Sequence, residues 1–102
     1  MNKQQYEAAL AIIKADCEGT QYLLADGKTC AVGALLRLAN VLDEALEGHS
    51  TPTSVQYDIL YHTYGLDRYD AESLMIANDQ PANVLKRKIT VAAALTQIYE
   101  ES

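Results

Sequence analysis

The apolar residues of this chain are mostly small or aliphatic, and this restricts the fold more than any other feature of the sequence. The chain contains 13 Leu and 15 Ala but neither Phe nor Trp. Ala and Leu are strong helix formers, whereas the β-branched and aromatic residues that favour strands are in the minority. We therefore expect an all-α protein with an aliphatic core.

Five segments repeat apolar residues at intervals of three and four, which is the spacing of one face of a helix. These segments cover residues 2–16, 30–47, 53–64, 67–78 and 81–99. Asn40 is placed to kink or split the second segment. A chain of 102 residues is too short for two ordinary domains. The sequence predicts one compact domain over residues 1–102, built as a bundle of about five helices.

The last segment has the strongest helical periodicity. Its expected inward face consists of Val84, Leu85, Ile89, Ala92, Leu95 and Ile98. Pro81 suits the first turn of this helix, because the N–H that proline lacks is not needed there.

A very short hairpin around residues 22–31 is an alternative to a plain loop before the second segment. Asp26-Gly27 is a strong turn signal and suits a type I′ turn. The stretches on either side are short and do not alternate cleanly between apolar and polar residues.

The charge of the chain argues against several classes of partner. The net charge is −6, from 8 basic and 14 acidic residues. Nucleic-acid-binding surfaces are basic, so we do not expect a nucleic-acid partner. No apolar run approaches the ~20 residues that a membrane-spanning helix needs, so no membrane partner is expected.

The cysteines and the N-terminal segment bear on compartment and metal binding. Glu7 and Lys14 interrupt and end the N-terminal apolar stretch, so it lacks the pattern of a secretory signal. We expect a cytoplasmic protein, with Cys17 and Cys30 as free thiols. The chain has no Cys-x-x-Cys or His-x3–5-His spacing, so we expect neither a metal nor another cofactor.

Cys30 is the residue best placed for catalysis. It is expected at a helix N-terminus, where the helix dipole lowers the pKa of a thiol. A thiol-dependent enzyme also needs a histidine base, and His62 is the candidate on the third segment. The competing interpretation is that Cys30 is buried as a small hydrophobic residue. We favour that interpretation and keep the thiol enzyme as the alternative.

Three tyrosines form a stripe on the third segment. Tyr57, Tyr61 and Tyr64 fall at i, i+4 and i+7. Tyrosine is enriched at protein interfaces because it offers rigid apolar area with a polar tip. The stripe either covers the core with its hydroxyls in water or binds a partner, which includes a second copy of the chain.

A longer pattern resembles a known family. Cys30-Ala31-Val32-Gly33-Ala34-Leu35, preceded by Asp26-Gly27 and followed by Asn78-Asp79, is similar to a motif of small bacterial and phage-borne proteins of unknown function. The resemblance spans residues 17–98, although the Trp that the family carries near the Cys-x-Gly segment is missing. It implies a compact helical fold, an origin in a phage or mobile element, and no known activity.

The resemblance also implies that four distant residues, Cys30, Gly33, Asn78 and Asp79, meet at one corner. We assign Asp26 and Gly27 to the same corner. We interpret the corner as structural: Asn78-Asp79 caps the last helix and bonds loop backbone near residues 26–30, while Gly33 lets the corner close. A ligand pocket at the same place is the alternative.

The sequence therefore predicts a small acidic helical module or regulator that binds another protein and has no catalytic activity. The identity of that protein partner is not encoded in any motif.

Overall fold

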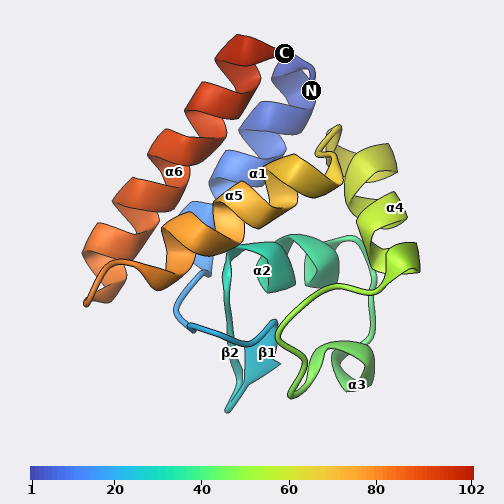
Figure 1. Cartoon of the computed structure of the whole chain (residues 1–102), viewed down its shortest axis with the longest axis vertical. Helices are drawn as coiled ribbons and strands as arrows, with labels where there is room; N and C mark the ends of the chain where they lie inside the picture. Colours follow the sequence, from blue (N-terminus) through green and yellow to red (C-terminus); the bar gives the residue numbers. More distant parts are fainter.

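Six helices and one minimal sheet make up the computed structural model, which describes all 102 residues (Figure 1). The helices are α1 (Lys3–Ala15), α2 (Ala31–Leu38), α3 (Asp43–Leu46), α4 (Ser54–Tyr64), α5 (Arg68–Asp79) and α6 (Val84–Glu101). The strands β1 (Leu24–Ala25) and β2 (Lys28–Thr29) pair antiparallel. The predicted all-α class is confirmed, and the short hairpin forms within the predicted range.

Side-chain caps explain where most of these helices begin. Asn2, Thr53 and Asp67 form capping boxes at the starts of α1, α4 and α5. Asn83 caps α6. The expectation that Pro81 lies in the first turn of the last helix is wrong, because the Asn83 cap starts that helix after the proline.

The segment predicted as one helix over residues 30–47 is divided in two. α2 ends at Leu38, and Asn40 adopts a left-handed φ of 70°. A right-handed helix cannot contain that conformation, and Asn is one of the few residues that tolerate it. The short helix α3 follows, so the chain has six helices rather than about five.

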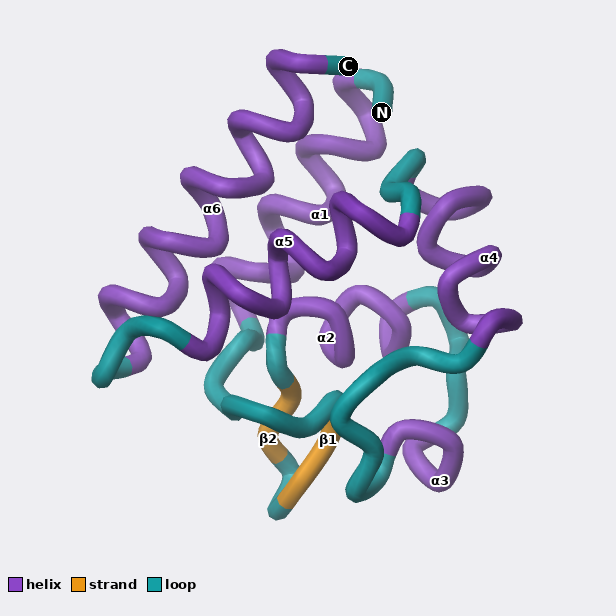
Figure 2. The backbone as a smooth tube through the Cα atoms, in the orientation of Figure 1, coloured by secondary structure: helices purple, strands orange, loops and turns teal.

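Helix α2 lies at the centre of the fold and packs against α1, α4 and α5. Figure 2 shows α1 and α6 side by side, with α5 crossing in front of α1 and the hairpin and α3 below α2. The two chain termini lie together at one end of the α1–α6 pair. The Cα radius of gyration is 11.9 Å. About 13 Å is ordinary for a domain of this length, so the chain forms one compact globule.

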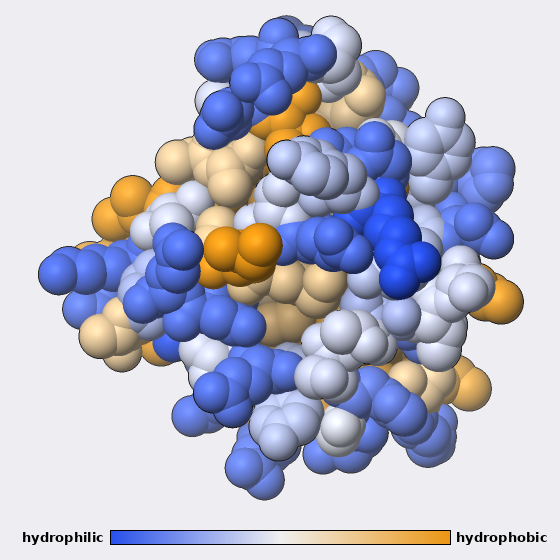
Figure 3. All heavy atoms as spheres, viewed as in Figure 1, coloured by the Kyte–Doolittle hydropathy of each residue, from blue (hydrophilic) through white to orange (hydrophobic).

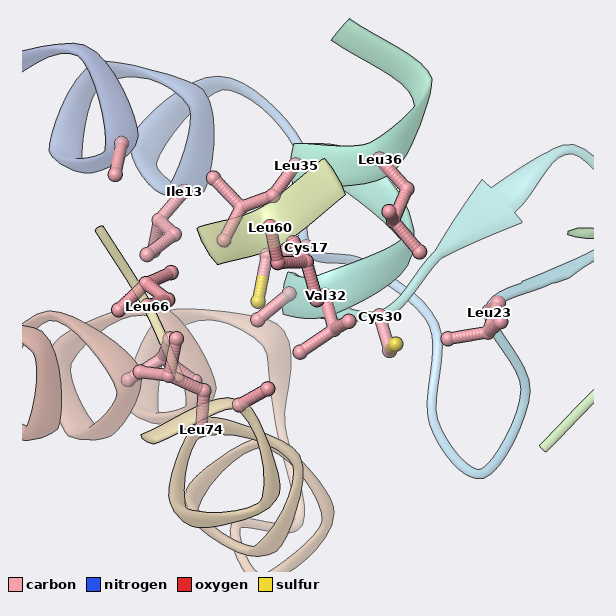
Figure 4. Close-up of a cluster of buried hydrophobic side chains, with 14 of the residues drawn as sticks. Ile13, Cys17, Leu23, Cys30, Val32, Leu35, Leu36, Leu60, Leu66 and Leu74 are labelled. Carbon is pink, nitrogen blue, oxygen red and sulfur yellow. The ribbon is translucent and has the colours of Figure 1, made fainter. Parts of the chain in front are cut away.

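Aliphatic side chains from the surrounding helices and from the loop between α4 and α5 meet on α2. Residues 31–36 of this helix are all buried, as a helix that is apolar on every side requires. Figure 4 shows Ile13, Leu60, Leu66 and Leu74 converging on it.

Gly33 allows α2 to lie directly against the segment that leads into β1. A Cβ atom added at Gly33 would lie 1.8 Å from the carbonyl oxygen of Leu23, closer than any real contact. Only glycine fits there, because the obstacle is backbone and cannot rotate away.

The inward face of α6 differs from the predicted one. Its buried residues are Arg87, Val91 and Leu95. Leu85 and Ile89, predicted to be in the core, are 71% and 61% exposed. Val84 is exposed as well, whereas Ala92 and Ile98 are partly buried. The prediction is therefore right for Leu95 and wrong for the first two turns, where an arginine occupies the inner side.

None of the six helices combines the length and apolarity that crossing a bilayer requires.

Candidate functional site

A buried asparagine ties three parts of the chain together. Asn78 lies near the end of α5 and has no exposed surface. Its Oδ1 accepts hydrogen bonds from the Ala31 N–H and from the Cys17 thiol, both at 3.0 Å. Its Nδ2 donates to the Gly19 carbonyl and to Asp79 Oδ1, also at 3.0 Å. The amide therefore uses both acceptor sites and both donors within the protein.

Arg87 completes this cluster from α6. Its Nε donates to the Asn78 carbonyl at 3.1 Å, and its Nη1 donates to the Glu18 carbonyl at 2.9 Å. The side chain is buried, so these bonds offset part of the cost of removing a charged group from water. Arg87 is not among the residues predicted at this corner. Its spacing with Val91 and Leu95, at i, i+4 and i+8, is the signal that could have revealed an inward-facing arginine.

We call this group of residues, Cys17, Gly19, Ala31, Asn78, Asp79 and Arg87, the Asn78 corner. Part of the predicted corner coincides with it. Cys30 and Gly33 adjoin it at the start of α2. Asp79 also accepts a hydrogen bond from the Gln21 N–H at 3.1 Å.

Other parts of the predicted corner need correction. Asn78 and Asp79 do not cap the last helix, because Asn83 does so. They bond to backbone at residues 19–21 and 31 rather than at 26–30. Asp26 and Gly27 form the exposed hairpin turn, with left-handed φ values of 53° and 76°, and they make none of these hydrogen bonds.

The buried side chains of the Asn78 corner offer no free polar group to a ligand, whereas Asp79 lies at its exposed edge. No buried side-chain nitrogen or oxygen in the protein lacks a hydrogen-bond partner. The hollow lined in part by Cys17 and Glu18 has a volume of only about 30 Å³. A larger hollow of about 410 Å³ lies over the loop and hairpin, lined by residues 18–22, 25, 26 and 28, and Gly19 is its only lining residue from the corner. These observations favour the structural interpretation of the corner over the ligand-pocket alternative.

Cys30 does not have the environment that the thiol-enzyme alternative requires. It is buried as the N-cap of α2, and its Sγ accepts a hydrogen bond from the Gly33 N–H at 3.4 Å. Burial raises its pKa, although the backbone N–H groups of Gly33 and Val32 oppose that rise. The expectation of a lowered pKa is therefore wrong. His62 is exposed on α4, packs edge-on against Tyr61, and has no hydrogen bond to Cys30.

Cys17 is also a buried free thiol. Figure 4 shows both sulfur atoms among aliphatic side chains. Burial, with a smaller contribution from Cys30, raises the pKa of Cys17 to about 12. No cluster of three or more His, Cys, Asp or Glu residues is arranged to hold a metal ion.

The tyrosine stripe on α4 does not form one exposed surface. Tyr64 is buried, and its hydroxyl donates to the Leu35 carbonyl at 2.7 Å. Tyr57 is also buried, with the guanidinium of Arg68 4.6 Å above the centre of its ring. Only Tyr61 is exposed, at 57%. Two of the three predicted binding tyrosines therefore serve mainly in packing.

Two adjoining hollows run along α4 and α5, and we call them together the α4/α5 groove. The first has a volume of about 430 Å³ and is lined by Ser50, Thr51, Tyr57, Arg68, Glu72, Met75, Ile76 and Asp79. The second has a volume of about 300 Å³ and is lined by Ser54, Tyr57, Asp58, Tyr61, Asp67 and Arg68. Tyr57 and Arg68 line both hollows. Figure 3 shows the corresponding face, with an apolar patch over α5 beside a shallow depression.

The groove combines an apolar floor with an acidic rim. Tyr57, Met75 and Ile76 supply its apolar surface. Four carboxylates line it, from Asp58, Asp67, Glu72 and Asp79, against the single guanidinium of Arg68. Arg68 is also partly neutralised, since its Nε lies 3.5 Å from Glu72.

Another hollow, of about 470 Å³, lies at the turn between α2 and α3. All its lining residues fall within residues 37–44, and the Arg37–Asp43 ion pair lies among them at 2.9 Å. No side chain from another part of the chain converges there. The α4/α5 groove is therefore the stronger candidate site.

Comparison of the chain with protein-family models, with curated proteins and with solved structures gives no match. The resemblance to small phage-borne proteins stays a prediction.

Proposed function

We propose that this protein is a non-catalytic interaction module whose α4/α5 groove binds a segment of a partner protein that carries basic side chains around an apolar anchor. The observation that carries the proposal is the pairing of an apolar floor with a rim of carboxylates. These two features define the partner segment by its chemistry: the apolar floor requires an apolar anchor, and the carboxylates favour basic side chains around it.

The apolar part of the groove supports an anchoring role. Ile76 is 61% exposed at the edge of a hollow that Met75 and Tyr57 continue inward. Binding hot spots are typically apolar or aromatic groups seated in such hollows and surrounded by polar residues. Full burial of an isoleucine side chain contributes about 1.5–3 kcal/mol, which is enough to anchor a peptide of modest affinity.

The rim supports a basic rather than an acidic ligand. Asp58 and Asp67 on one side and Asp79 on the other make no ion pair with a basic residue. A lysine or arginine of the partner would add a favourable charge interaction at each of these positions. Arg68 above Tyr57 is an internal example of a cation held on a ring of this groove.

The thiol alternative receives less support. The buried Cys30 and the exposed His62 lie in separate environments, and the burial of Cys30 favours the neutral thiol over the reactive thiolate.

Selection of peptides tests this proposal. A random dodecamer library displayed on phage is selected against the immobilised protein, and the enriched peptides are synthesised and measured by fluorescence anisotropy. We expect them to combine Lys or Arg with a large apolar residue. Ile76→Ser should weaken their binding at least about tenfold, because the anchor loses its apolar contact. Asp58→Asn should weaken binding less, and added salt should reduce that second effect.

Matched variants outside the groove control for general damage. Val55→Ser changes an exposed apolar residue of α4 that does not line the groove, and Glu44→Gln removes an exposed carboxylate on α3. Neither should alter binding. Enrichment of peptides without basic residues would refute the proposal, and so would peptides whose affinity is unchanged by Ile76→Ser.

A further inference from the structure

The N-terminal half of α6 presents the same chemistry that the α4/α5 groove is suited to bind. Leu85 and Ile89 are four residues apart and therefore adjacent on the helix surface. They are 71% and 61% exposed, and nothing in the fold covers them. Lys86 and Lys88 lie on either side of this pair, because Arg87 between them points inward to Asn78 and Glu18. Lys86 is exposed, whereas Lys88 is half-buried and its Nζ donates to the Lys14 carbonyl at 2.9 Å, so Lys86 is the freer charge of the two. We call Leu85, Lys86, Lys88 and Ile89 the α6 ridge.

The ridge is the only place in this acidic chain where consecutive basic residues occur, and it is also apolar. The groove is the complementary surface, with exposed Ile76 among carboxylates. Ridge and groove are built by different helices and share no residue. Figure 3 shows an apolar patch at the left edge, where α6 runs, apart from the patch over α5.

We propose that the groove of one copy of this protein binds the α6 ridge of a second copy, so that the chain assembles head to tail. This inference rests on the proposed function and names its partner. A contact between two different surfaces leaves one groove and one ridge free in every dimer, and further copies can add. Both surfaces are small, so the assembly is expected to be weak and to depend on protein concentration.

The self-contact also accounts for the direction in which the α6 side chains point. A helix that served only the core would turn Leu85 and Ile89 inward and Arg87 outward. The inward position of Arg87 fixes the opposite rotation, which leaves an apolar pair in water with a lysine on each side. Contiguous exposed apolar patches bordered by polar residues are typical of interaction surfaces.

Sedimentation velocity of single-surface variants tests the inference. The wild-type protein is measured from about 10 µM to about 1 mM, the range of a weak contact. We expect its average mass to rise with concentration beyond that of a dimer. The ridge variant Leu85→Ser/Ile89→Ser and the groove variant Ile76→Ser/Tyr61→Ala should each remain monomeric. An equimolar mixture of the two variants should form a dimer and stop there, since only one intact groove and one intact ridge remain.

Several outcomes would overturn the inference. A wild-type protein that stays monomeric over this range would do so, and so would a mixture of variants that does not dimerise. Two alternative contacts would also contradict it. The first is a symmetric contact between the ridges of two copies, in which the groove variant still self-associates and the ridge variant does not. The second is a membrane surface, in which vesicles of phosphatidylserine and phosphatidylcholine bind the wild type and not the ridge variant while no self-association occurs.

Two further measurements keep the result specific. Val55→Ser should assemble as the wild type does, and circular dichroism should show that both double variants keep their helical content. If basic peptides bind the groove while the protein stays monomeric, the self-assembly fails and the proposed function stands. If no peptide binds and the groove variant assembles normally, the proposed function itself fails.

Discussion

Two residues of α5, only two positions apart, each have the burial that is ordinarily expected of the other. Asn78 is polar and has no exposed surface, whereas Ile76 is apolar and 61% exposed. The same exchange occurs in α6, where Arg87 is 6% exposed and Leu85 is 71% exposed. In both helices the polar residue turns toward the Asn78 corner and the apolar residue turns toward solvent.

The difference between the two sides lies in hydrogen bonding. On the inner side, every polar group of Asn78 has a partner, so burial does not leave a donor or acceptor unsatisfied. On the outer side, most of the apolar surface of Ile76 and Leu85 is exposed to solvent and packs against nothing in the monomer. The inner residues should therefore determine stability and the outer ones binding, and the predictions that follow test this division.

The largest expected effect is at Gly33, beside the Asn78 corner. Gly33→Ala should destabilise the protein by more than about 3 kcal/mol, because the new methyl group collides with backbone rather than with a movable side chain. Urea unfolding followed by circular dichroism measures the change. Gly27→Ala in the hairpin turn is the control: it meets no atom within 4 Å and has only the strain of its φ of 76°, about 1 kcal/mol. Equal losses for the two variants would show that α2 has room to move.

The comparison within α5 gives the next prediction. Asn78→Ala should lower the free energy of unfolding by about 2–4 kcal/mol, because the Ala31 N–H and the Gly19 carbonyl lose their partner inside the protein. Ile76→Ser should change it by less than about 1 kcal/mol, as is usual for exposed positions. Urea unfolding of both variants and of the wild type measures the two changes in the free energy of unfolding. Similar losses for both would mean that Ile76 stabilises the fold and is not reserved for a partner.

Local signals in the sequence located the helices well. Gly65 ends α4 in a left-handed conformation, and the break at Asn40 divides the second helix, both through the intrinsic preferences of these residues. Asn78 and Asp79 were connected with the start of α2 only through the family resemblance. Their backbone partners at Gly19 and Gln21 carry no sequence signal, because backbone carbonyls and N–H groups are the same in every residue.

The rotation of α6 could not be predicted from periodicity. Val84, Leu85 and Ile89 fit an inward apolar face as well as Val91 and Leu95 do, and the pattern alone does not choose between the two. The choice depends on Arg87, whose guanidinium reaches carbonyls at positions 18 and 78. The groove was missed for a similar reason. Arg68, Glu72 and Ile76 lie on one side of α5, but their opposite wall comes from the segment before α4.

An effect that is absent at neutral pH and appears only at alkaline pH concerns the thiol of the Asn78 corner. Burial raises the pKa of Cys17 to about 12 from an ordinary value of 9.0. The folded state therefore holds a proton that the unfolded chain releases above pH 9. The contribution of Cys17 is complete below that pH and declines above it by about 1.4 kcal/mol per pH unit until the folded pKa is reached.

The variant Cys17→Ser keeps a donor to Asn78 but does not ionise in this range. The stability advantage of the wild type over this variant should shrink from pH 9 upward, as measured by urea unfolding at several pH values. Cys30 is a second buried thiol with a raised pKa, and the variant Cys30→Ser provides the comparison. An advantage that stays constant to pH 11 would mean that water reaches Cys17 in the folded protein. The Asn78 corner would then be open to solvent, and the contrast with the groove would lose its physical basis.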